Sequence, residues 1–109
     1  MTRRSSLVAL LLLVAMENAS AADAPAGKAL FDHYCAVCHA AGPGHAGTMR
    51  LAELRGPTNA VLEQRKDLGT AYVSQVVRQG LVEMPPWRPS EIDDAALNQI
   101  AQYLAHGRR

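Results

Sequence analysis

The stretch that decides how this chain of 109 residues is interpreted is Cys35-Ala36-Val37-Cys38-His39. Two residues between the cysteines place both sulfurs on one side of a helical turn, and the adjacent histidine faces the same side. The C-x-x-C-H spacing is that of covalent haem attachment, in which two thiols add to the two vinyl groups of a porphyrin and the histidine reaches the iron. The motif therefore predicts one haem c, attached through Cys35 and Cys38, with His39 as an axial iron ligand.

Three other uses of a C-x-x-C pair are less consistent with the rest of the chain. A thioredoxin-type redox pair needs a β-α-β context, and no stretch here alternates apolar and polar residues as a strand does. A zinc site needs further ligands at the right spacing; His33 and His45 exist, but no second C-x-x-C does. A disulfide across two residues would close a short, strained loop of little stabilising value.

A second axial ligand is predicted at Met84, because electron-carrying cytochromes pair histidine with methionine. Met84 is followed by Pro85 and Pro86, which give a rigid loop suited to presenting a ligand. A neutral thioether favours reduced iron and so raises the potential. The alternatives are that Met84 fills the core, or that His45 is the ligand instead. Met49 is expected to pack on the haem side of the core.

The N-terminus has the features of a cleaved export signal. Two arginines precede an apolar run of ten residues, Leu7–Met16, and Ala19-Ser20-Ala21 matches the small-x-small cleavage pattern. A membrane anchor is the alternative, but a spanning helix needs roughly 20 apolar residues. We expect residues 1–21 to be removed, residues 22–109 to form one periplasmic domain, and the mature protein to have no stable membrane insertion.

Charge argues against a nucleic-acid partner. Loss of Arg3, Arg4 and Glu17 with the signal lowers the basic residues from 11 to 9 and the acidic residues from 10 to 9. A neutral domain lacks the cationic surface that neutralises phosphates.

A domain this small buries little surface on folding and often needs a cross-link or a bound cofactor to be stable. A buried haem would supply that stabilisation.

Apolar periodicity predicts an all-α domain. Helices are expected where apolar residues recur at helical spacing, and loops where glycine and proline cluster. The expected helices are 26–36, beginning near Pro25, then 70–79 and 93–106, with a short helical turn at 49–55; the expected loops are 40–48, 56–59 and 84–89, and 60–69 gives no clear signal. Asp93 is expected to cap the last helix, and Ile92 to pack against Leu97.

With Cys35–His39 near the start, Met84-Pro85 in a late loop and a closing amphipathic helix, residues 26–106 resemble the class I cytochrome c family. The resemblance implies a small all-α fold of three to four helices around the haem. It implies that the first and last helices cross where Gly27 and Phe31 meet Tyr103. In the family, the carbonyl of a Gly-Pro pair accepts the proton of the ligand histidine; here Gly47-Thr48 stands in that place, which leaves the orienting carbonyl unassigned.

Several segments are also similar to the cytochrome subunits of flavocytochromes of the p-cresol methylhydroxylase and eugenol hydroxylase type. They are His45–Thr48, Leu62–Leu68, Val76–Gly80 and Met84-Pro85. That resemblance implies an electron-transfer subunit, not itself an enzyme, that accepts electrons from a flavin dehydrogenase subunit. An apolar docking face near the haem edge would then include Met49, Val82, Pro85 and Pro86.

Two functions from different classes follow from the iron site. With His39 and Met84 both bound, no substrate reaches the iron and the protein is an electron carrier. With Met84 unbound, the open site would suit a haem enzyme or a gas sensor. A structural domain without haem is the third possibility. Beside the methionine loop, Trp87 and Arg88 are either contacts to the haem edge and a propionate, or ordinary core and surface residues.

Overall fold

The computed structural model describes residues 19–107, and these residues form helices joined by loops and turns. The helices are α1 (Ala19–Tyr34), α2 (Ala36–His39), α3 (Ala46–Arg55), α4 (Thr70–Gln79) and α5 (Asp94–His106), with 3-10 turns at Pro57–Asn59 and Leu62–Gln64. Within that range no strand is present, only an isolated bridge between Leu81 and Met84. The expected all-α fold is confirmed. The export signal expected at residues 1–21 lies outside the described residues except for its last three.

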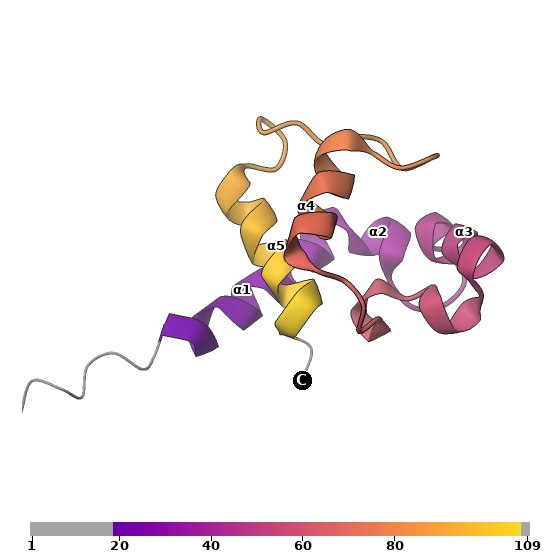
Figure 1. The fold of residues 1–109 in the computed structure, drawn as a ribbon, viewed down its shortest axis with the longest axis horizontal. Coiled ribbons are helices and arrows are strands. Elements are labelled where there is room, and N and C mark those ends of the chain that lie inside the picture. The colour runs from indigo at the N-terminus through magenta and orange to yellow at the C-terminus, as the bar shows by residue number, and fades with distance from the viewer. Residues whose placement is uncertain (1–18, 108–109) are drawn as a thin grey trace, which may run out of the picture.

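The first and last helices cross at close range, as Figure 1 shows for α1 and α5. Gly27 is buried at the crossing, where a Cβ would lie 2.5 Å from the backbone oxygen of Gln99 and 2.6 Å from Cβ of Tyr103. One turn later, the rings of Phe31 and Tyr103 pack 5.9 Å apart between centroids. The absence of a side chain at Gly27 is therefore what allows the two helices to approach.

We expect Gly27→Ala to destabilise the domain by about 1–3 kcal/mol, because the added methyl group meets the backbone of α5 and cannot be accommodated by a rotamer change. Guanidinium unfolding of the haem-bound protein measures the loss. Gly69→Ala is the matched control, since a Cβ at Gly69 would have no neighbour within 4 Å. Equal stability of the two variants would contradict the close crossing.

Helix α4 packs beside α5 and completes the core (Figure 1). Its buried face presents Val73 and Val77 to the core residues of α5. At the start of α5, the Asp93 carboxylate accepts a hydrogen bond of 2.7 Å from the backbone N–H of Ala96, which is the expected cap. Ile92 is 1% exposed and belongs to the same core as Leu97. The helices predicted at 70–79 and 93–106 are confirmed, with Asp93 as the capping residue.

The start of the first helix was predicted wrongly. Helix α1 begins at Ala19 and continues through Pro25, although Pro25 was expected to mark its start. A proline removes one N–H donor, and the alanines on both sides of Pro25 have the highest helix propensity. The short turn expected at 49–55 is a longer helix, α3, that begins at Ala46. None of the helices in residues 19–107 is long and apolar enough to cross a membrane.

Candidate haem site

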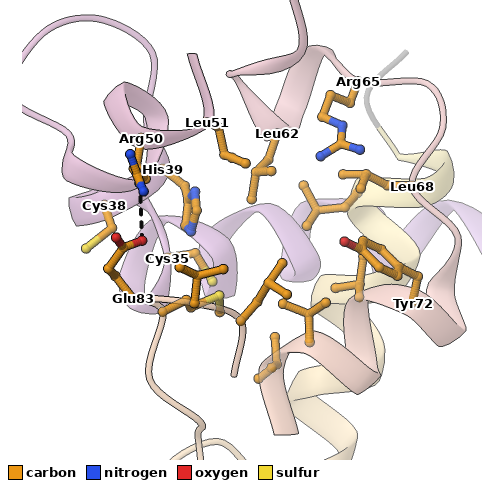
Figure 2. A pocket seen from close by; sticks show the side chains of 18 of the residues that line it. Cys35, Cys38, His39, Arg50, Leu51, Leu62, Arg65, Leu68, Tyr72 and Glu83 are labelled. Carbon is orange, nitrogen blue, oxygen red and sulfur yellow. Dashed lines mark hydrogen bonds and ion pairs between the residues drawn. The ribbon is translucent and has the colours of Figure 1, made fainter. Parts of the chain in front are cut away.

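A pocket of about 580 Å³ opens between the helices and the loop that follows α4. This volume lies within the range of about 300–1,000 Å³ that is typical of ligand and cofactor pockets. Figure 2 shows side chains from several segments converging on it. Its apolar lining comes from Phe31, Leu51, Leu54, Leu62, Leu68, Val73, Val76, Val77, Leu81, Val82, Ile100 and Leu104.

Both cysteines of the motif line this pocket as free thiols. The chain turns sharply between α1 and α2, and the backbone N–H groups of Cys38 and His39 both donate to the carbonyl of Cys35, at 3.1 and 2.9 Å. That turn carries the two sulfurs and the imidazole on one short segment. Burial raises the pKa of the Cys35 thiol to about 11, and the neighbouring Cys38 adds to the rise. Cys35 is therefore protonated at neutral pH.

His39 also lines the pocket, and its imidazole points into it in Figure 2. Burial lowers the pKa of His39 below its ordinary value, so the ring is neutral at physiological pH, the form that binds a metal ion. Gly47 makes room for this ring, because a Cβ there would lie 2.6 Å from Cε1 and 2.8 Å from Nδ1 of His39. Only a glycine at position 47 therefore lets the His39 imidazole take this position.

The carbonyl that orients His39 is still unassigned. Nδ1 of His39 is buried and, among residues 19–107, has no hydrogen-bond partner. Thr48, where the family has proline, is buried and donates 2.8 Å to the carbonyl of Ala40. His45 lies just before α3 and its Nδ1 is 3.0 Å from the carbonyl oxygen of Val37. His45 does not line the pocket, which argues against it as the rival iron ligand.

Met84 lines the same pocket from a loop that is closed by its own backbone hydrogen bonds and tied to α4 at Val77. Its N–H donates 2.9 Å to the carbonyl of Leu81, and the Leu81 N–H donates 3.1 Å back to the carbonyl of Met84. Further on, the Trp87 N–H donates 2.8 Å to the carbonyl of Val77. Gly80 begins the loop with a φ of +75°, and a Cβ there would lie 2.7 Å from the Met84 carbonyl oxygen. The backbone of this loop is therefore held independently of any ligand.

Other residues near the motifs are placed away from the pocket. Met49 is 53% exposed on α3 and does not line the pocket, so the expected packing on the haem side is wrong. Trp87 packs against the core and against the ring of Tyr34, 6.2 Å away. The side chain of Arg88 is 83% exposed. Because neither Trp87 nor Arg88 is among the lining residues, the structure favours their assignment as core and surface residues.

Four charged residues that line the pocket were not predicted from the sequence: Arg50, Arg55, Arg65 and Glu83. Arg65 is buried and its guanidinium lies at the pocket, with Tyr72 nearby (Figure 2). It comes from the segment 60–69, which has no apolar periodicity and so gave no signal in the sequence. The fold, and not a local pattern, brings Arg65 into the pocket wall beside Leu62 and Leu68 of the same segment.

These residues fit a covalently bound haem. Two thiols and a neutral imidazole lie on one segment, a thioether comes from another, and the lining between them is apolar. In residues 19–107 no group of three or more His, Cys, Asp or Glu side chains is arranged to hold a metal ion by itself, as the zinc interpretation requires. The His39 ring packs directly against Gly47, in the space that a Cβ would need, and this contact helps to hold the imidazole in place as an iron ligand.

Comparison with known proteins agrees with this chemistry. A family profile described as cytochrome c oxidase, cbb3-type, subunit III matches residues 22–104. The cytochrome c subunit of 4-cresol dehydrogenase (hydroxylating) from Pseudomonas putida is 38% identical over 86% of this chain and 72% of its own length. The chain belongs to the class I cytochrome c family. Cytochrome c6 from Leptolyngbya boryana is 32% identical to this cytochrome c over 76% of the chain and 91% of its own length. No solved structure gives a significant match.

As a cytochrome c, the protein is an electron carrier, and its cofactor is one covalent haem c, consistent with the single Cys35/Cys38 pair. When bound, the haem supplies reversible one-electron chemistry at its iron. Cys35 and Cys38 would attach it, and the apolar lining of the pocket would exclude water from it.

Proposed function

We propose that this cytochrome c is the electron-accepting subunit or dedicated partner of a flavin dehydrogenase, with His39 and Met84 as the two axial ligands of its haem iron. The observation that carries the ligand assignment is that both side chains line one apolar pocket with Cys35 and Cys38. The cysteines hold the macrocycle, His39 is neutral and cradled, and the fixed loop presents the Met84 thioether. A neutral thioether ligand raises the potential, as an acceptor of flavin electrons requires.

The alternative is a haem enzyme or gas sensor with an open sixth position. It requires Met84 to stay away from the iron. The backbone hydrogen bonds between Leu81 and Met84, and the tether from Trp87 to Val77, hold the loop at the pocket and argue against this alternative. Binding of an external ligand distinguishes the two functions.

The dehydrogenase partner is supported by the 38% identity to a cytochrome c subunit of a dehydrogenase and by an apolar rim around the pocket. Val82 is 76% exposed at the pocket edge and has a φ of +52°, a strained conformation for a β-branched residue. Leu81 and Pro85 also line the pocket and are exposed beside it. An exposed apolar rim that the fold holds under strain suits a docking contact.

Binding to the dehydrogenase is expected to be tight and to weaken little as salt rises, because the mature chain is neutral and salt screens mainly exposed charges. A titration of the haem-bound protein against a flavin dehydrogenase encoded beside it, at low and high salt, measures this. Val82→Asp should weaken binding at least tenfold, whereas Gln102→Asp on the exposed face of α5 is the matched control. Weak binding that salt abolishes would leave a freely diffusing carrier.

Export is part of the same proposal. Residues 1–21 would be removed as a signal, leaving residues 22–109 as a periplasmic cytochrome domain. Intact-mass measurement of the haem-bound protein tests it, and a mature chain that retained residues 1–21 would contradict it.

A further inference from the structure

A buried arginine at the haem pocket has no role in the ligand set. Arg65 is 7% exposed, and it and Thr48 are the buried polar or charged residues of the described chain. A buried cation is costly unless it is paired and hydrogen-bonded. A buried arginine in the wall of an apolar pocket therefore indicates that its charge is balanced by a bound anion as well as by the protein.

Only part of the Arg65 guanidinium is used within the protein. Nε donates 2.9 Å and Nη2 donates 2.6 Å to the two carboxylate oxygens of Asp67. Nη1 donates to no residue of the described chain and is not fully enclosed by protein atoms. The bidentate contact fixes the plane of the guanidinium, since its donors form a rigid fork. Asp67 thus fixes the orientation of the Arg65 guanidinium and leaves the N–H groups of Nη1 free to bind another group.

The two ends of the pocket differ in chemistry. Figure 2 shows Cys35 and Cys38 at one end, and Arg65 with Tyr72 at the other. At the cysteine end, Arg50 is already paired, with contacts of 3.0 Å to Glu53 and 3.3 Å to Glu83. Arg65, at the other end, is paired with a single carboxylate, that of Asp67, and keeps the donors of Nη1 for a further anion.

A protohaem has a matching polarity. Its two vinyl groups lie on one edge and its two propionates on the opposite edge. Attachment of the vinyl edge to Cys35 and Cys38 directs the propionate edge away from the cysteines, toward the end of the pocket that holds Arg65. A planar guanidinium is the side chain best suited to receive a carboxylate there.

We propose that Arg65 binds a haem propionate through its Nη1 edge, with Asp67 as the positioning residue. This inference rests on the proposed function only in requiring the haem to occupy the pocket. A cation beside the propionate keeps that carboxylate ionised and favours the reduced iron. Arg65 therefore keeps the potential high and nearly constant around neutral pH.

The charged and titratable groups that face Arg65 are Asp67, Tyr72 and, through its field on Asp67, Arg55. Arg65 lowers the pKa of Asp67 to about 2, so that carboxylate is ionised throughout the neutral range. Asp67 therefore keeps its charge between about pH 5 and pH 8 and does not contribute to a pH-dependent potential in that window.

The test uses the haem-bound protein and three variants. In Arg65→Gln the midpoint potential should be lower than in the wild type at about pH 8, and should fall as pH rises from about pH 5, because protonation of the freed propionate favours reduced iron. Arg65→Lys keeps the charge and should give an intermediate profile. Arg88→Gln removes an exposed arginine outside the pocket and should match the wild type. A wild-type profile in Arg65→Gln would overturn the proposal.

Nuclear Overhauser contacts in the wild-type protein test the inference even if the Arg65 variants do not fold. We expect contacts between the propionate methylene protons and the Arg65 side chain. Propionates that contact other residues and not Arg65 would overturn the proposal while leaving the haem site intact. A protein that purifies without covalent haem would instead refute the proposed function, so the two failures are distinguishable.

Discussion

Replacement of both Cys35 and Cys38 by alanine is expected to give a chain without covalent haem and without a stable fold. The sequence contains no other cysteine, so no thiol remains to hold the macrocycle. The core residues Phe31, Ile100 and Leu104 line the pocket, so an empty site exposes the core of a domain that is already small. Acid–acetone extraction measures the covalent haem, and far-ultraviolet circular dichroism measures the helix content.

Val37→Ala is the matched control for the double variant. Val37 lies between the cysteines and is 74% exposed, so its truncation changes the motif without touching either thiol or the core. That variant should retain covalent haem and near-normal stability. Haem that stays with the Cys35→Ala/Cys38→Ala chain through extraction would refute attachment at these residues.

Replacement of Met84 by alanine is expected to open the sixth coordination position. The sulfur-to-iron band at the red end of the oxidised spectrum should disappear. The potential should fall by on the order of a tenth of a volt or more, since axial ligands set haem potentials over a range of about 0.8 V. The loop should keep its backbone, because its bonds to Leu81 and Val77 do not use the Met84 side chain. Spectroscopy and a redox titration check both effects.

The control for this variant is Met49→Ala, in the only other methionine after residue 21. Met49 is exposed on α3 and lies outside the pocket, so its loss should leave the spectrum and the potential unchanged. A spectrum that changes in Met49→Ala but not in Met84→Ala would contradict the ligand assignment.

Local patterns predicted much of the fold and of the site. The helix at 70–79 follows from a valine stripe that ends at a glycine, and the last helix from its apolar rhythm and the Asp93 cap. The C-x-x-C-H spacing and the two prolines after Met84 predicted side chains that the fold brings to one pocket. These features depend on residues that are close together in the sequence, and a single sequence is enough to recognise such local patterns.

The features that depend on distant contacts could not be predicted. Arg65 is buried although it lies in the irregular segment 60–69, whose only regular element is a 3-10 turn at Leu62–Gln64, and no periodicity marks such a segment. Gly47 matters because the ring of His39 occupies the space of its missing Cβ, a contact that sequence spacing does not reveal. The exposure of Met49 depends on how α3 is rotated about its axis, which its weak apolar pattern does not fix.

Addition of carbon monoxide to the reduced, haem-bound protein tests most directly whether this cytochrome c is an electron carrier with both axial positions filled. The absorption spectrum should not change, because His39 and Met84 leave no position for the gas, whereas Met84→Ala should form a complex under the same conditions. Formation of a carbon monoxide complex by the wild-type protein would contradict the axial assignment and favour an enzyme or sensor with an open iron site.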